Sequence, residues 1–319
     1  MSIDYLRISV TDRCNLRCVY CNPLGESGFI NHDEILKFEE IHRIVRLLAG
    51  RGIRKVRLTG GEPLIRKNVT ELVKKLASVE GIDELALTTN GILLGEMAAE
   101  LKDAGLDRVN ISIDSVGRDN YKDITGFDFL EKATEGLHKA LEVGLGPVKL
   151  NSVIIKGVND SAEQILLLAG MSLKLPVTVR FIEYYPTGNN TRPAGDYVPN
   201  GEIKKIIEGK FGQLGNIING KSDGPASSFK IEGSAGSIGF ISGRSSVFCE
   251  TCNRLRLTSD GKIMPCLYSS QQYDLKKLIR YEATDDELLE YFKMILDKKS
   301  EYTKLTSTSS DFLMQDIGG

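Results

Sequence analysis

The sequence predicts an α/β protein: a partial (β/α)6 barrel of the TIM type, followed by a C-terminal α+β region that closes the barrel mouth. Six short β-like runs alternate with longer helical runs up to about residue 185, which is the order expected of a parallel sheet. Within the runs, polar and apolar residues alternate, so each strand has one polar and one apolar face. A chain of 319 residues, 41% of them hydrophobic, can bury the core of such a fold.

The expected strands cover residues 5–10, 53–59, 84–89, 107–114, 147–155 and 177–183. Between the first two, apolar residues from Phe38 to Leu48 recur at spacings of three and four, which predicts an amphipathic helix. Similar patterns predict helices over residues 69–78, 95–104, 129–143 and 162–173. The first part of the chain is therefore a series of βα units.

Basic side chains gather on the polar faces of four of these strands. They are Arg7, Lys55, Arg57, Lys149 and Arg180. A parallel sheet covered by helices on both faces would show continuous apolar strands instead. We therefore predict an open barrel whose polar inner face lines a binding cavity. For any single alternating strand, the solvated face of an antiparallel sheet is the alternative interpretation.

The pattern changes after about residue 186 to stretches rich in Gly, Asn, Pro and Ser. We divide the chain into a barrel domain, residues 1–212, and a C-terminal region, residues 213–319. That region contains an expected hairpin over residues 253–267, turned where Asp260 and Gly261 supply the dihedrals of a tight turn. A capping box between Thr284 and Glu287 then predicts a helix to about residue 298.

The charge balance argues against one class of function. The chain has 41 basic and 43 acidic residues, so no global basic surface attracts nucleic acid. No stretch approaches the ~18 apolar residues of a membrane span, and the first residues lack the pattern of a signal peptide. We expect a cytoplasmic protein with neither a nucleic-acid nor a membrane partner.

All six cysteines fall into two triads. The first is Cys14, Cys18 and Cys21, and the second is Cys249, Cys252 and Cys266. The first triad directly follows the first strand, at the end where open α/β folds place their ligands. The third cysteine of the second triad is brought back by the hairpin. In a reducing compartment such sets indicate metal ligands or catalytic thiols rather than disulfides.

The ligand count favours iron–sulfur clusters over zinc. A structural zinc site needs four protein ligands, and neither triad has a fourth cysteine or a nearby histidine; the histidines are His32, His42 and His138. Three thiolates on a four-iron cluster leave one iron open to a non-protein ligand. A zinc or structural iron site remains the alternative, and it is stronger for the second triad.

Residues 14–21 (CNLRCVYC) resemble the signature of radical S-adenosylmethionine enzymes, and residues 59–63 (TGGEP) resemble the GGEP motif of the same superfamily. The resemblance implies that the first triad holds the cluster that binds and reduces S-adenosylmethionine. It also implies that the backbone and the Glu of the second motif receive the methionine amino group. Glycines let the main chain approach a ligand closely, which is a physical reason for them apart from the likeness.

A closer resemblance, over nearly the whole chain, is to the GTP 3',8-cyclase family, which catalyses the first step of molybdenum cofactor (molybdopterin) biosynthesis. It rests on residues 6–14, 87–91, 180–183 and 252–257 and on the Gly-Gly end. The second triad with its Asn-Arg-x-Arg insert and the Gly-Gly end are the discriminating parts, because the first triad alone fits many radical enzymes. One departure is Tyr185, which stands where the family has a methionine that touches the cofactor.

The family resemblance implies a role for each matching residue. The cofactor contacts would be Tyr20, Gly60, Gly61, Glu62, Thr88, Ser112 and Tyr185. The substrate contacts would be Arg7, Lys55, Arg57, Lys149, Arg180, Arg254 and Arg256. The catalytic set would be Arg254, Arg256, Gly318 and Gly319, with the tail reaching into the cavity. The second triad would hold a cluster whose open iron meets the guanine ring.

The resemblance implies a lyase that converts GTP to (8S)-3',8-cyclo-7,8-dihydroguanosine 5'-triphosphate, with two 4Fe-4S clusters and S-adenosylmethionine as cofactors. Its partners would be GTP, an external electron donor and the next enzyme of the molybdopterin pathway, and a homodimer is compatible with the sequence. Two alternatives stay open. One is another radical enzyme with an auxiliary cluster, such as a peptide-modifying maturase, and the other is a non-catalytic iron–sulfur or zinc protein that serves as a binding scaffold.

Overall fold

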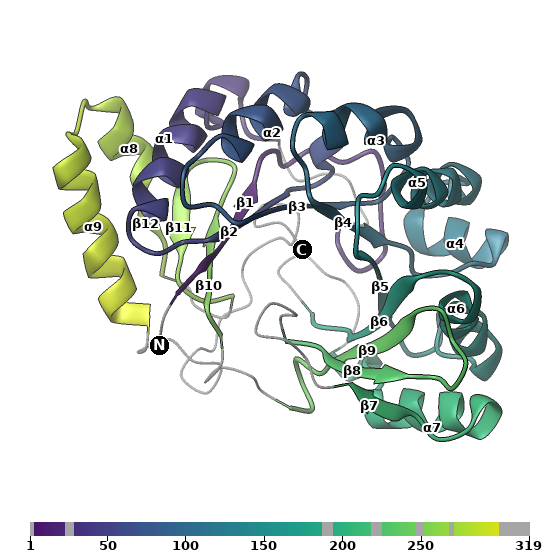
Figure 1. Ribbon diagram of the computed structural model, residues 1–319. Coiled ribbons are helices and arrows are strands. Elements are labelled where there is room, and N and C mark those ends of the chain that lie inside the picture. The colour runs from purple at the N-terminus through teal and green to yellow at the C-terminus, as the bar shows by residue number, and fades with distance from the viewer. Residues whose placement is uncertain are drawn as a thin grey trace.

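The computed structural model describes residues 3–22, 29–186, 194–217, 225–246, 252–267 and 271–299. In this part of the chain the strands form one curved sheet in the order β12-β11-β10-β1-β2-β3-β4-β5-β6-β9-β8-β7. Neighbouring strands are parallel from β10 through β9. Figure 1 shows the sheet as an open arc with helices along its outer side. The predicted partial barrel is confirmed, and no described pairing joins β7 to β12 to close it.

All six predicted barrel strands form, with ends within two residues of those expected. They are β1 (Tyr5–Ser9), β2 (Lys55–Thr59), β3 (Glu84–Thr89), β4 (Arg108–Ser112), β5 (Val148–Ile154) and β6 (Val177–Glu183). The predicted helices are α1 (Phe38–Ala49), α2 (Val69–Ala77), α3 (Leu94–Asp103), α5 (Leu130–Glu142) and α6 (Ala162–Lys174). Short 3-10 helices are η1 (His32–Glu34), η2 (Pro63–Ile65) and η3 (Ala194–Asp196).

Three helices of the described residues were not predicted: α4, α7 and α8 (Leu275–Arg280). In α4 (Arg118–Thr125) the buried positions are Tyr121, Ile124 and Thr125, too few apolar residues to reveal a helical period. In α7 (Asn200–Phe211) the buried Ile203 and Ile207 have helical spacing, but the segment lies among Pro and Gly residues that are typical of loops.

The C-terminal region extends the same sheet at both edges. Its strands are β7 (Gly215–Ile217), β8 (Ser227–Lys230), β9 (Ser237–Ile241), β10 (Arg254–Leu257), β11 (Lys262–Met264) and β12 (Tyr273–Asp274), and its last helices are α8 (Leu275–Arg280) and α9 (Asp285–Lys298). The predicted hairpin is confirmed, because β10 and β11 pair antiparallel. The capping box at Thr284 is also confirmed. Parallel pairing of β10 with β1 was not predicted.

The hydrophobic core lies between the outer face of the sheet and the helices. Outward residues such as Leu6, Ile8, Val56 and Leu58 are fully buried there. Each such side chain stabilises the fold by about 1.5–3 kcal/mol relative to an exposed one. The helices thus cover the apolar face of the barrel strands β1 to β6, and the polar face is left to the inside of the arc.

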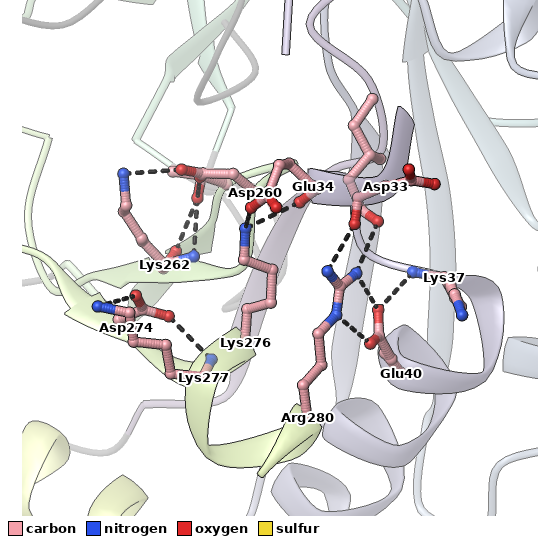
Figure 2. A network of polar contacts seen from close by, with 12 residues as sticks. Asp33, Glu34, Lys37, Glu40, Asp260, Lys262, Asp274, Lys276, Lys277 and Arg280 are labelled. Carbon is pink, nitrogen blue, oxygen red and sulfur yellow. Dashed lines mark hydrogen bonds and ion pairs between the residues drawn. The ribbon is translucent and has the colours of Figure 1, made fainter. Parts of the chain in front are cut away.

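A polar network ties the C-terminal region to the segment that follows the first triad (Figure 2). Arg280 of α8 pairs with Glu40 of α1, with Nε to Oε1 at 2.7 Å. The same guanidinium donates to the carbonyls of Asp33 at 2.5 Å and Ile35 at 3.2 Å. Lys276 pairs with Glu34 beside it. One arginine therefore holds three points of the chain between η1 and α1.

We expect Arg280→Ala to lower the free energy of unfolding by about 1 kcal/mol, because it removes a charge-assisted pair and two carbonyl contacts at once. The matched control is Lys277→Ala in the same helix, whose 3.7 Å pair with Asp274 is exposed, and it should cause no measurable loss. Denaturant unfolding of both variants measures this. Equal losses would show that Arg280 is an ordinary surface residue.

Candidate functional site

Three arginines from neighbouring strands form one row on the inner face of the sheet. The strand register places Arg7 of β1 beside Arg256 of β10 on one side and beside Arg57 of β2 on the other. Facing residues of neighbouring strands point to the same side of a sheet. The inward orientation predicted for Arg7 and Arg57 is therefore confirmed, and the hairpin brings Arg256 into the same row.

The row concentrates positive charge where solvent is limited. Burial lowers the pKa of Arg7 well below its usual range, and the nearby Arg256 and Arg57 lower it further. Burial, followed by the charge of Arg254, lowers the pKa of Arg256 to about 10. Like charges packed together disfavour the charged state, and a bound anion removes that penalty. The row is chemically suited to a ligand with several negative charges.

The other predicted inner residues lie further along the same face. Lys149 of β5 stands beside Asn110 of β4, and Arg180 of β6 stands beside Asn151 of β5. Lys149 and Arg180 are both buried. Lys55 faces Tyr5, and Tyr5 in turn faces Arg254. All seven predicted substrate residues thus share the inner face.

Three inner-face residues are not among the predicted site residues, although the sequence had already placed Asn151 on the polar face of its strand. Tyr5 accepts a hydrogen bond from Nε of Arg57, and its ring lies 5.7 Å from that guanidinium. Arg108 pairs with Glu84 on the inside of the sheet. Oδ1 of Asn151 is buried with no hydrogen-bond partner among the described residues. The period-two pattern that identified Arg7 applied to these positions as well.

The segment of the first triad leaves the carboxyl end of β1 and is fixed by backbone contacts. The amides of Arg17 and Val19 donate to the carbonyls of Thr125 and Ile124 at the end of α4, both at 2.9 Å. The amide of Cys21 donates to the carbonyl of Cys18 at 2.9 Å, which forms a tight turn between two of the thiols. Helix α4, which was not predicted, thus supports the segment that carries the first triad.

The glycines of the TGGEP motif pack against the chain's own backbone. A Cβ on Gly60 would lie 2.5 Å from the carbonyl oxygen of Thr11, and one on Gly61 would lie 2.2 Å from that of Arg13. The amides of Gly61 and Glu62 donate to these same two carbonyls, each at 2.8 Å. The glycines were predicted to let the main chain approach a ligand closely. In this structure they let it approach the segment between β1 and Cys14.

Glu62 is fully buried, and its carboxylate accepts three hydrogen bonds from the protein. The donors are the amide of Leu64 at 3.0 Å, the hydroxyl of Thr89 at 2.8 Å and the amide of Asn90 at 2.7 Å. Burial raises the pKa of Glu62 to about 7 although these bonds oppose the shift. Glu62 thus ties η2 to the end of β3, and its expected contact with the cofactor stays a prediction.

Two further predicted cofactor residues lie near the carboxyl ends of the strands. Ser112 ends β4, and Thr88 of β3 accepts a hydrogen bond from Arg57 at 3.4 Å. Tyr20 donates its hydroxyl proton to Oδ2 of the buried Asp114 at 2.7 Å. Burial raises the pKa of Asp114 to about 6, against the effect of that bond. Asp114 therefore orients the tyrosine that precedes Cys21.

The described cysteines of the two triads lie at opposite ends of the strands that carry the arginine row, on either side of the row. Because β10 runs parallel to β1, Cys252 precedes the amino end of the pair, whereas Cys14 follows its carboxyl end. Cys266 follows β11, which is antiparallel to β10, so it returns to the side of Cys252. Cys249, Gly318 and Gly319 lie outside the described residues. Both ligand sets thus flank the same polar face.

The environments of the two triads differ. Burial would raise the pKa of Cys252, but Arg254 and Lys299 lower it below the usual value. Burial, with the carboxylate of Asp114 and the neighbouring thiols, raises the pKa of Cys18 instead. Burial raises the pKa of the predicted cofactor residue Tyr185; Arg244 opposes this shift and Cys266 adds to it. The effect of Cys266 shows that Tyr185 lies toward the second triad.

Comparison with known proteins gives two matching family models: the radical SAM superfamily over residues 8–169 and Molybdenum Cofactor Synthesis C over residues 177–305. A GTP 3',8-cyclase of Pelotomaculum thermopropionicum is 47% identical, over 90% of this chain and 88% of its own length. The GTP 3',8-cyclase of Desulforamulus reducens is 44% identical, over 100% of this chain and 98% of its own length. The chain belongs to the GTP 3',8-cyclase family. It is therefore a radical S-adenosylmethionine enzyme, and its cofactors include S-adenosylmethionine and an iron–sulfur cluster.

Solved structures with low identity share the fold of this GTP 3',8-cyclase family member. Streptococcus suis SuiB bound to S-adenosylmethionine superposes with a TM-score of 0.63 at 15% identity, over 91% of this chain and 68% of that chain. Methylornithine synthase (PylB) superposes with a TM-score of 0.53 at 20% identity, over 67% of this chain and 64% of that chain. In the described residues, no helix is both long and apolar enough to cross a membrane.

The three thiols of the first triad are the type of ligand that holds an iron–sulfur cluster. Within the described ranges, no three His, Cys, Asp or Glu side chains are close enough to hold one metal ion. A four-iron cluster does not require this, because each thiolate binds a different iron. Burial and the Glu62 carboxylate raise the pKa of Cys14 to about 11, and iron would supply the positive charge that stabilises the thiolate there.

We expect Gly61→Ala to reduce 5'-deoxyadenosine formation at least tenfold, because the new Cβ collides with the backbone of Arg13 and displaces the segment before Cys14. Gly170→Ala is the matched control, since a Cβ there meets nothing within 4 Å; it should stay within about twofold of the parent and not weaken helix α6. Product assay and bound iron measure both. Parent-like activity of Gly61→Ala would contradict this role of the glycine.

Proposed function

We propose that the chain binds GTP along the arginine row and converts it to (8S)-3',8-cyclo-7,8-dihydroguanosine 5'-triphosphate. The observation that carries this is the row of Arg256, Arg7 and Arg57 between two cysteine triads. A nucleoside triphosphate has the several negative charges that such a row needs, and arginine pairs well with phosphate oxygens. Lys55, Lys149, Arg180 and Arg254 complete the polar face around the phosphates and ribose.

The protein's part in the reaction is to position and shield the reactants. When bound, the reduced cluster and S-adenosylmethionine would supply a 5'-deoxyadenosyl radical able to abstract the 3' hydrogen of GTP. Joining of the 3' carbon to C8 of guanine would leave one unpaired electron on the base, so one electron from the external donor and one proton would complete the product. Cys14, Cys18 and Cys21 would hold that cluster, and Tyr20, Gly60, Gly61, Glu62, Thr88, Ser112 and Tyr185 would place the cofactor. The basic residues would hold the ribose toward the first triad. The buried strand faces would keep water from the reaction.

We propose a second 4Fe-4S cluster on Cys249, Cys252 and Cys266, with an open iron toward the guanine ring. The lowered pKa of Cys252 supports it, because a ligand to iron must be a thiolate. The position of this triad at the amino end of β10 supports it as well, since the base would then lie away from the first triad and the ribose near it.

The remaining parts of the proposal concern the tail, the domains and the partners. Gly318 and Gly319 would reach the substrate, where the terminal carboxylate could pair with Arg254 or Arg256. The division into residues 1–212 and 213–319 is part of this proposal. An external electron donor and the next enzyme of molybdopterin synthesis are the expected partners, alongside a homodimer.

We expect Cys18→Ala to abolish 5'-deoxyadenosine formation, because the first triad holds the cluster that cleaves the cofactor. Cys252→Ala should retain some uncoupled cleavage but give no cyclised nucleotide, because the second triad only places the substrate. Anaerobic incubation with reductant, S-adenosylmethionine and GTP, followed by mass analysis, measures both products. If a folded Cys252→Ala variant that keeps the first cluster loses cofactor cleavage as completely as Cys18→Ala, the two triads do not have these separate roles.

We expect Arg254→Ala and Arg256→Ala each to weaken GTP binding about tenfold to a hundredfold. A charge-assisted hydrogen bond contributes about 1.5–3 kcal/mol, which is that range in affinity. Arg51→Ala is the control, because Arg51 is exposed in the turn after α1. Calorimetric titration on protein with unchanged iron content measures the affinities. If both variants bind GTP like the control, these arginines only solvate the hairpin.

A further inference from the structure

A buried lysine contacts the second triad and has no place in the function proposed above. Lys299 follows the last residue of α9, and only 6% of it is exposed. Its Nζ donates to the carbonyl oxygen of Pro265 at 2.6 Å and lies 3.8 Å from Sγ of Cys252. Lysine is among the residues least often buried, so a specific set of partners must offset its loss of hydration.

The helix before it explains how Lys299 reaches this position. Leu288, Phe292 and Ile295 are buried along one side of α9, and Lys299 continues the same spacing of four, three and four. The capping box at Thr284 fixes the start of this helix. The apolar side of α9 is therefore anchored in the core, and it directs the last side chain on that side to the second triad.

The charges around Lys299 show what kind of group it serves. Its Nζ lies 3.8 Å from Sγ of Cys252, and the same ammonium holds the carbonyl directly before Cys266. A buried ammonium is stable beside a group that carries negative charge, which a neutral thiol does not provide. Thiolates bound to an iron–sulfur cluster provide that charge permanently.

We propose that Lys299 is a positioning residue of the second cluster, which fixes Cys252 and the backbone before Cys266 and raises the cluster's reduction potential by its positive charge. This rests on the proposed function, because it requires a cluster on the second triad. Reduction adds an electron, so a nearby cation stabilises the reduced state more than the oxidised state. Charge and hydrogen bonds to the sulfurs are known determinants of cluster potentials.

The test uses the full-length chain with Cys14, Cys18 and Cys21 replaced by Ala, so that only the second triad can bind a cluster. Lys299→Met should lower the midpoint potential, measured by a redox titration followed by electron paramagnetic resonance, by at least about 59 mV, a tenfold change for one electron. Lys299→Arg should stay near the parent because it keeps the charge. Lys298→Met, at the exposed neighbouring position, should leave the potential unchanged.

Iron and sulfide analysis separates the two levels of the proposal. If the parent with the three alanines binds no cluster, the second site of the proposed function fails and the inference fails with it. If about four irons are bound and Lys299→Met leaves the potential unchanged, only the role of Lys299 is overturned. Loss of the cluster in Lys299→Met but not in Lys299→Arg supports the inference. Loss of the cluster and of cooperative unfolding in both variants overturns it in favour of a purely structural role.

Discussion

The parallel pairing of β10 with β1 is the interaction on which the site depends. It joins a strand from the end of the chain to the first strand of the barrel, and its register sets Arg256 beside Arg7. It also places Cys252 at the amino end of the paired strands and Cys14 at their carboxyl end, on either side of the arginine row. Without this pairing, Arg256 and Cys252 would not lie on the strand pair that carries Arg7 and leads to Cys14.

At both ends of the site, hydrogen bonds within the protein hold the segments that carry the cysteines. At the first triad, Gly61 and Glu62 clamp the exit of β1 through the carbonyls of Thr11 and Arg13. At the second, Lys299 holds the carbonyl before Cys266. The network around Arg280 then fixes the segment that returns from the first triad. Enzyme sites built on such rigid supports keep their geometry through the reaction.

The sequence predicted the barrel because period-two alternation and βα order are local signals, and it predicted the inward arginines for the same reason. It could not predict the partner of β10, since nothing local specifies a pairing across some 250 residues of chain. Arg108 and Tyr5 carried the same alternation but were not recognised as site residues. The glycines of TGGEP were interpreted as ligand contacts, because the backbone they meet became visible only in the fold.

Stabilisation of the protein by bound ligand tests whether the inner face is an anion site for a nucleoside triphosphate. At a hundred times its dissociation constant, GTP should raise the free energy of unfolding by about 2.7 kcal/mol. Guanosine at the same concentration should raise it far less, because it offers no charge to Arg256, Arg7 and Arg57. Equal stabilisation by guanosine and GTP would show that the inner face does not bind the triphosphate.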